Sequence, residues 1–265
     1  MPSSKRLQLT LVCFNINWSK LQILLWINEK MEIKNKKALV FGGTSGIGLA
    51  TCEQLIEKGA DVIAISRDPS KANSVKHNRL TFEICDVRIE EDVKKVFEKY
   101  APFEILISAA TGGSRAAGPF LEMDMLGFKN SFDKLWGYAN VVRYGTNYLS
   151  SDGTIVLVSG APARRMKPGQ IALSAVGGAV ENLVRGVANE IAPRRINTVS
   201  PGLIDTPMFS QEGEDRKTFL NSATASHSIK RAGKPEEVAK GIIFAVENDF
   251  VNGTTIDVDG GWVNS

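Results

Sequence analysis

The feature that most constrains the fold is a short apolar run that ends in a glycine-rich turn. Residues 39–48 read Leu-Val-Phe-Gly-Gly-Thr-Ser-Gly-Ile-Gly, which places glycines at 42, 46 and 48. A Cβ at such positions would keep the backbone away from a phosphate group, and the N–H groups that open the next helix attract one. The run therefore predicts a strand, a turn and a helix of an α/β sheet, with a pyrophosphate site at their junction.

Short β-branched runs alternate with helical patterns along the rest of the chain. We expect strands at 38–41, 61–66, 80–85, 104–107, 154–158, 195–199 and 254–258. We expect helices at 47–58, 90–100, 129–149, 174–191 and 235–247, and a polar substrate lid at 205–234. This order is typical of a single Rossmann-type doubly wound parallel sheet of about seven strands with helices on both faces.

Composition narrows the classes of partner. The net charge of +3 comes from the first thirty residues, because the chain from 31 onward holds 28 basic and 28 acidic residues. A neutral body argues against a nucleic-acid partner. Three cysteines without C-x-x-C spacing and only two histidines predict neither a disulfide framework nor a metal site. We therefore expect a cytoplasmic protein without a metal.

Residues 1–30 differ from the rest of the chain. Their apolar patches are interrupted by Asn15, Asn17 and Lys20, and a small-residue cleavage site is missing. This pattern fits neither a secretory signal nor a membrane span. We expect 1–30 to be an N-terminal extension, either disordered or a product of start-site choice, and 31–265 to be the nucleotide-binding domain, with no membrane partner.

The tip of the second expected strand bears on the choice of nucleotide. NAD-binding proteins usually place an acidic residue there, whereas this chain has Ser66 followed by Arg67. A hydroxyl and a guanidinium suit a 2′-phosphate, and a charge-assisted hydrogen bond of roughly 1.5–3 kcal/mol predicts about 10- to 100-fold preference for NADP(H) over NAD(H). Asp86, after the third strand, is a candidate to accept the adenine amino group, with capping of the next helix as the alternative.

These residues, together with Ser-Pro-Gly-Leu-Ile-Asp-Thr-Pro-Met at 200–208 and Val-Asp-Gly-Gly-Trp at 258–262, resemble the short-chain dehydrogenase/reductase family. The resemblance covers 36–265 and implies one Rossmann domain that forms a homodimer or homotetramer through two long helices. It also implies that Pro201 and Gly202 lie beside the nicotinamide and that Thr206 holds its amide. The predicted cofactor-binding residues are Gly42, Thr44, Ser45, Gly46, Ile47, Gly48, Ser66, Arg67, Asp86, Val87, Ala109, Ala110, Pro201, Gly202, Ile204 and Thr206.

The chain departs from that family where the chemistry is done. The family uses a Ser, a Tyr, a Lys four residues after the Tyr, and an Asn on an earlier helix. The matching positions here are Gly160, Leu173, Gly177 and Lys134. A shift of register by one residue places Ser174 and Gly178 at the Tyr and Lys positions, which does not restore the pair. Loss of a positioned general acid costs about 10²- to 10⁴-fold in rate.

Lys134 is the first candidate for a replacement proton donor, because burial in an apolar pocket lowers a lysine pKa toward neutrality. The alternative is that Lys134 serves only as a structural or ribose-binding cation. Ser159 is a weaker candidate for orienting a carbonyl, since adjacent strand residues face opposite sides of a sheet. Four loop cations favour an anionic substrate: Arg115, Arg164, Arg165 and Lys167.

Three functions follow from this mixture. The first is an NADP-dependent oxidoreductase that acts on a small carbonyl or alcohol substrate with a non-standard proton donor. The second is a catalytically inactive NADP-binding sensor or scaffold. The third is a non-redox enzyme, such as an isomerase or lyase, built on the same fold.

Overall fold

The computed structural model describes residues 31–72, 74–111 and 115–265, and the extension predicted at 1–30 lies outside these residues. Seven parallel strands form one sheet in the order β3-β2-β1-β4-β5-β6-β7. The strands are β1 (Lys37–Phe41), β2 (Asp61–Ser66), β3 (Leu80–Ile84), β4 (Phe103–Ser108), β5 (Leu149–Val158), β6 (Arg195–Pro201) and β7 (Thr255–Val258). The predicted doubly wound sheet is confirmed.

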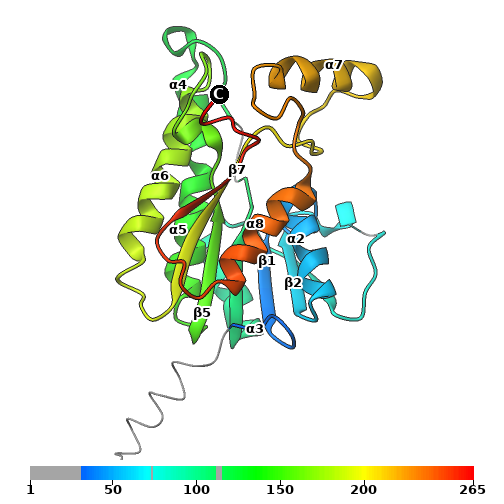
Figure 1. The fold of residues 1–265 in the computed structure, drawn as a ribbon. Coiled ribbons are helices and arrows are strands. Elements are labelled where there is room, and N and C mark those ends of the chain that lie inside the picture. Colours follow the sequence, from blue (N-terminus) through cyan, green and yellow to red (C-terminus); the bar gives the residue numbers. More distant parts are fainter. Residues whose placement is uncertain (1–30, 73, 112–114) are drawn as a thin grey trace, which may run out of the picture. The chain divides into compact units, whose positions relative to one another are not determined.

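Helices cover both faces of this sheet (Figure 1). They are α2 (Gly46–Glu57), α3 (Glu90–Tyr100), α4 (Met125–Ser131), α5 (Asp133–Gly145), α6 (Ile171–Val187), α7 (Gly213–Thr224) and α8 (Pro235–Glu247). Three short 3₁₀ turns are η1 (Pro69–Ala72), η2 (Phe120–Glu122) and η3 (Ala161–Ala163).

Alternation along the strands divides the core into two clusters. Leu39 and Phe41 of β1 join the cluster that holds Val96 of α3, Val141 of α5 and Val180 of α6. Ala38 and Val40 belong to the other cluster, with α2 and α8. Successive side chains of a strand point to opposite faces, and a parallel sheet covered on both sides needs both faces apolar. The apolar strand runs of the sequence therefore reflect burial on two sides.

The helix predicted at 129–149 is wrong in detail, because it is two helices and ends earlier. The Ser131 hydroxyl donates to the carbonyl of Gly127 at 2.9 Å, and the amide of Phe132 donates to Lys129, three residues back, at 3.0 Å. Back-bonding of this kind bends helices. Strand β5 then begins at Leu149, earlier than the predicted start at 154. The register between β4 and β5 shifts across these residues.

Helix α6 and the segment 205–234 also differ from the prediction. Helix α6 starts at Ile171, because the backbone N–H of Lys167 donates to the Gln170 side chain at 2.9 Å and forms the turn that precedes the helix. It ends at Val187, after which turn-type bonds lead to Arg194. The segment 205–234, expected to be a polar lid, contains α7, whose buried residues are only Leu220 and Thr224.

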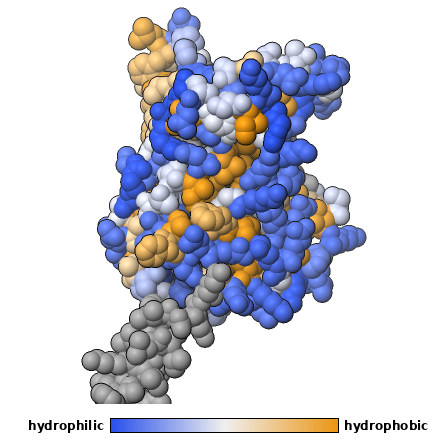
Figure 2. Space-filling model, in the orientation of Figure 1, coloured by the Kyte–Doolittle hydropathy of each residue, from blue (hydrophilic) through white to orange (hydrophobic). Residues whose placement is uncertain are grey.

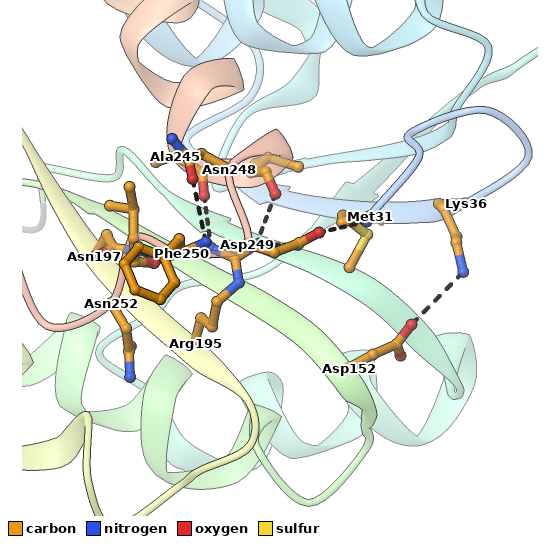
Figure 3. A network of polar contacts seen from close by, with 12 residues as sticks. Met31, Lys36, Asp152, Arg195, Asn197, Ala245, Asn248, Asp249, Phe250 and Asn252 are labelled. Atoms are coloured by element: carbon orange, nitrogen blue, oxygen red, sulfur yellow. Dashed lines mark hydrogen bonds and ion pairs between the residues drawn. The ribbon is translucent and has the colours of Figure 1, made fainter. Parts of the chain in front are cut away.

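A buried arginine stabilises the edge of the sheet where the strands begin (Figure 3). Arg195, the first residue of β6, donates to the carbonyls of Ala245 at 2.9 Å and Val246 at 2.7 Å, near the end of α8. Asp249 accepts from Arg195 at 3.4 Å and from the amide of Met31 at 2.8 Å. Cations stabilise helix C-termini, where carbonyls have no partner within the helix. This network is therefore structural.

Apolar side chains gather at one corner of the surface. Figure 2 shows them above α4 at the upper left, and the exposed large apolar residues of η2 and α4 are Phe120, Leu121, Met125 and Leu126. Within the described parts of the chain, helices of the length and hydropathy needed to cross a bilayer do not occur.

Candidate active site

The carboxyl ends of the strands open into one cavity of about 1220 Å³. Its wall includes the turn after β1, the tips of β2 and β3, the loops after β4, β5 and β6, and the start of α6. Ligands of doubly wound sheets bind at this edge, where neighbouring crossovers run to opposite faces. All sixteen residues that the sequence predicts to bind cofactor line this cavity.

The turn after β1 is as tight as its glycines require. A Cβ on Gly48 would lie 2.0 Å from the carbonyl oxygen of Gly42. A Cβ on Gly42, whose φ is +80°, would lie 2.7 Å from the amide nitrogen of Ala110. Ser45 precedes α2 in an extended conformation, and its side chain makes no capping hydrogen bond. The first N–H groups of α2 thus remain for a ligand at the cavity wall, which suits a pyrophosphate.

The tips of β2 and β3 meet at the far end of the cavity. The Ser66 hydroxyl accepts from the amide of Asp68 at 3.2 Å, which leaves its own proton to donate, and Arg67 is exposed beside it. Asp86 is held by Arg88, whose Nη2 and Nε lie 2.6 Å and 3.0 Å from its two carboxylate oxygens. This contact lowers the pKa of Asp86, with Arg67 adding to the effect.

The alternative role of Asp86 as a helix cap is wrong. Helix α3 follows Ile89 without a side-chain cap. Asp86 instead accepts from the amide of Arg88 at 3.0 Å. Its carboxylate faces the cavity as well, so the adenine role stays a prediction.

The loop after β6 closes the opposite end. Thr206 is buried, and its methyl group would lie 3.3 Å from a Cβ on Gly46. Thr206, in the loop that begins at Pro201 and Gly202, therefore lies close to Gly46 in the turn after β1. The predicted nicotinamide side and the predicted pyrophosphate side are therefore adjacent.

Lys134 lies on α5 and lines the cavity. Its Nζ donates to the carbonyl of Ser159 at 3.2 Å and lies 5.4 Å from the centre of the Tyr138 ring. Burial, reinforced by the positive charge of Arg115, lowers the pKa of Lys134 to about 7. Among the described residues, carboxylates do not come within ion-pair distance of Nζ. The lysine can thus exist in both protonation states near neutral pH.

Tyr138 does not supply the missing phenol. Its ring is fully buried, and its hydroxyl donates to the carbonyl of Val158 at 3.1 Å. Burial raises the pKa of this phenol. Tyr138 therefore packs beneath Lys134.

The Ser159 hydroxyl turns toward α6 and donates to Glu181 at 3.0 Å. Glu181 is 2 % exposed, and its other oxygen lies 3.5 Å from Nε of Arg164. Arg164 also pairs with Asp257, through Nη1 at 2.7 Å. This geometry favours a structural role for Ser159. The sequence analysis missed Glu181, whose only signal was an acidic residue inside an apolar helical stripe.

The three positions that the sequence analysis matches to the family's Ser, Tyr and Lys differ in the space around them. A Cβ on Gly160 would meet only Pro162 at 3.6 Å and the carbonyl of Pro201 at 4.0 Å. A Cβ on Gly177 would lie 3.0 Å from the Cβ of Ala163 in η3. Leu173 lies in the first turn of α6 and lines the cavity. The space for a side chain is thus open at Gly160, whereas at Gly177 it is crowded by the turn η3.

The four loop cations separate into two groups. Arg115 and Lys167 line the cavity, whereas Arg164 is held by carboxylates and Arg165 lies 3.5 Å from the carbonyl of Val263. Arg115 donates to the sulfur of Met208 at 3.1 Å, and burial lowers its pKa. Lys167 lies over the Trp262 ring at 4.7 Å. Positive charge within the cavity therefore comes from Arg115, Lys134 and Lys167, besides Arg67 at the far end.

The segment 205–234 is held in place by side-chain contacts that the sequence did not reveal. Arg216 of α7 pairs with Asp205 and donates to the carbonyls of Thr206 at 2.7 Å and Phe209 at 2.9 Å. Phe209 and Phe219 pack together, with ring centres 5.3 Å apart, and both line the cavity. The lid thus gives the cavity an apolar roof.

Comparison with known proteins agrees with this arrangement. Residues 42–263 match the family model described as enoyl-(acyl carrier protein) reductase. Carbonyl reductase family member 4 of Danio rerio is 30% identical over 243 residues, which cover 86% of this chain and 98% of that protein. The 3-oxoacyl-[acyl-carrier-protein] reductase FabG of Thermotoga maritima is 32% identical over 251 residues, which cover 88% of this chain and all (100%) of the relative.

A solved structure gives the same result. A small-chain dehydrogenase crystallised in complex with NADPH superposes with a TM-score of 0.74 and 28% identity, covering 88% of this chain and 100% of that one. The relatives, the seven-stranded sheet and the glycine turn agree. The chain therefore belongs to the short-chain dehydrogenase/reductase family of oxidoreductases.

Proposed function

We propose that this protein is an NADP-dependent reductase of a small carbonyl compound, or a dehydrogenase of the corresponding alcohol. In this proposal Lys134 takes over the proton-donor role that the family gives to a tyrosine. The observation that carries the proposal is the Lys134 amine in the cavity wall, with its pKa lowered to about 7. A general acid is most effective when its pKa lies near the working pH.

The residues present fit the nucleotide. The first N–H groups of α2 suit the pyrophosphate, and Ser66 and Arg67 suit a 2′-phosphate. Thr206 lines the same cavity, which supports its proposed contact with the nicotinamide amide. When bound, NADPH supplies the hydride. The relative solved with NADPH supports the choice of nucleotide.

Lys134 would then act as the general acid in reduction and as the general base in the reverse direction. Its ammonium form donates a proton to the carbonyl oxygen as charge develops there, and its amine form takes one back in the reverse direction. Burial, reinforced by the positive charge of Arg115, lowers the pKa of Lys134 to about 7, so both forms are available near neutral pH. Arg115 and Lys167 also favour a substrate that carries a carboxylate or phosphate.

A specific observation favours a second candidate, an inactive NADP-binding sensor or scaffold. A Cβ on Gly177 would lie 3.0 Å from the Cβ of Ala163, so a side chain at this position would be crowded. In either case we propose a cytoplasmic homodimer or homotetramer. The apolar corner of η2 and α4 supports association with a second copy (Figure 2).

The test is a fluorescence titration of the full chain with NADPH and NADH, followed by a screen of carbonyl substrates. Arg67→Ala should weaken NADPH binding about 10- to 100-fold and leave NADH binding unchanged. Lys134→Met should lower turnover about 10²- to 10⁴-fold while NADPH binding stays within about threefold of wild type.

Each outcome selects one candidate. NADPH binding with no turnover on any carbonyl supports the sensor. Turnover that survives Lys134→Met contradicts the proposed proton donor. The matched control is Lys129→Arg, on the exposed face of α4, which should change neither binding nor turnover.

A further inference from the structure

Lys134 has the surroundings of a nucleophilic amine as well as those of an acid. Its Nζ reaches the carbonyl of Ser159, one residue from Gly160. The side-chain space at Gly160 is open, and Gly160 and Leu173 both line the cavity beside it. A small reactant can therefore lie next to Nζ at a place where relatives of this family carry a hydroxyl side chain.

The charges around Lys134 favour its neutral form. Burial and the positive charge of Arg115 both act against the ammonium form. A lysine desolvated in a pocket beside another cation is activated toward carbonyl compounds. The lowered pKa of Lys134 agrees with this geometry, because a free electron pair on Nζ is required for attack.

We propose that Lys134 condenses with a small aldehyde or ketone in this cavity to form a covalent imine. The Nζ electron pair attacks the carbonyl carbon and forms a C–N bond. The carbonyl oxygen leaves as water after it takes up two protons, both originally on Nζ, and a C=N bond remains. Hydrolysis reverses the step, so neither an oxidant nor a reductant is needed.

This activity goes beyond carbonyl reduction and competes with it for the same nitrogen. If a hydride reduced the imine, the product would be a secondary amine that stays attached to Lys134, and the site would be lost. Productive imine chemistry here is therefore non-redox, as in an isomerase or lyase. Arg115 and Lys167 select a carbonyl compound that also bears a carboxylate, such as a 2-oxo acid.

The experiment traps the imine without any nicotinamide. The full chain is incubated with pyruvate, reduced with sodium borohydride, digested and analysed by mass spectrometry. We expect one reduced adduct per chain, located at Lys134 and about tenfold or more above the adduct at exposed Lys129 in the same sample. That internal comparison does not depend on any variant folding correctly.

Variants and an uncharged probe complete the test. Lys134→Arg and Lys134→Met should abolish the major adduct, whereas Lys129→Arg should retain it. Acetone in place of pyruvate should give less adduct if Arg115 and Lys167 select the carboxylate. Adducts spread evenly over surface lysines, or none at Lys134, would overturn the proposal. Because no NADPH is present, that failure leaves the proposed reductase to be judged by its own assay.

Discussion

The two ends of the cavity differ in which chemical groups they present to a ligand. At the cofactor end, the turn after β1 still approaches its neighbours so closely that a Cβ on Gly48 would lie 2.0 Å from a carbonyl oxygen. At the other end, Gly160, Leu173 and Gly177 line the cavity at the positions that the sequence analysis matches to the family's Ser, Tyr and Lys, and Lys134, Arg115 and Lys167 bring positive charge. Nucleotide binding and proton transfer are therefore separable requirements of this fold.

The difference teaches that the two ends are under unlike constraints. The glycine turn is fixed by backbone sterics, so a substitution there disrupts the turn itself. Gly160 follows β5, and Leu173 and Gly177 belong to α6, and both elements form with these residues in place. Chemistry can change at one end while the scaffold and the cofactor half remain.

The largest effect should come from the cofactor end. Gly48→Ala forces the turn after β1 to open, because its Cβ would collide with the carbonyl of Gly42. We expect NADPH affinity to fall by more than about 100-fold. Gly186→Ala in α6, where a Cβ meets nothing within 4 Å, is the matched control. Retained NADPH binding in Gly48→Ala would show that this turn does not hold the phosphates.

The pH dependence of turnover examines the catalytic end. Carbonyl reduction needs the ammonium form of Lys134, whose pKa is lowered to about 7. The rate should be highest below pH 7 and fall about tenfold per pH unit above it, since the donor is lost. Measuring kcat from pH 5.5 to 9 tests this, with NADPH affinity recorded at each pH. A rate that rises through pH 7 would contradict an ammonium donor in the reductive direction.

Stability provides a test of Lys134 that does not require a substrate. The unfolded chain keeps a normal lysine pKa of 10.5, whereas the folded pKa is about 7. Below pH 7 both states are protonated and the folded state carries the full cost of a buried charge. That cost shrinks as pH rises from 7 to about 10.5. Lys134→Met should therefore raise the free energy of unfolding by about 1–3 kcal/mol at pH 6, and by less at pH 9.

Urea denaturation at both pH values measures this change. Lys129→Arg, which alters an exposed residue, should leave the free energy of unfolding unchanged at each pH. An equal effect of Lys134→Met at pH 6 and pH 9 would mean that the lysine keeps a normal pKa in the folded protein.

The sequence predicted the first strand, the glycine turn and the first helix well because their signals are local. The order strand, glycine turn and helix is written in consecutive residues, and the tip of β2 follows directly from its sequence. Lys134 could be placed on its helix, but the effect of Arg115 could not be foreseen, since the two residues meet only through the fold. Glu181 was missed for the same reason, because its partners Ser159 and Arg164 come from other segments. Helix α7 was missed because few of its residues are buried.

The smallest predicted effect tests whether the position of Gly177 is too crowded for a side chain. Gly177 and Gly178 are neighbours in α6, and replacing a helical glycine with alanine normally stabilises by about 0.5–1 kcal/mol. Gly178→Ala should show that gain, because a Cβ there meets nothing within 4 Å. Gly177→Ala should show less or none, since its Cβ would lie 3.0 Å from that of Ala163. Thermal unfolding of both variants measures the difference.

If Ala163→Gly restores the gain in the Gly177→Ala background, the contact between η3 and α6 is what occupies the place of the family's lysine. The catalytic end would then have repacked around its loss, and reinstating the lysine would need room to be made for it first. Equal gains at 177 and 178 would instead mean that the position is still open, and that the missing lysine could be restored without rearrangement.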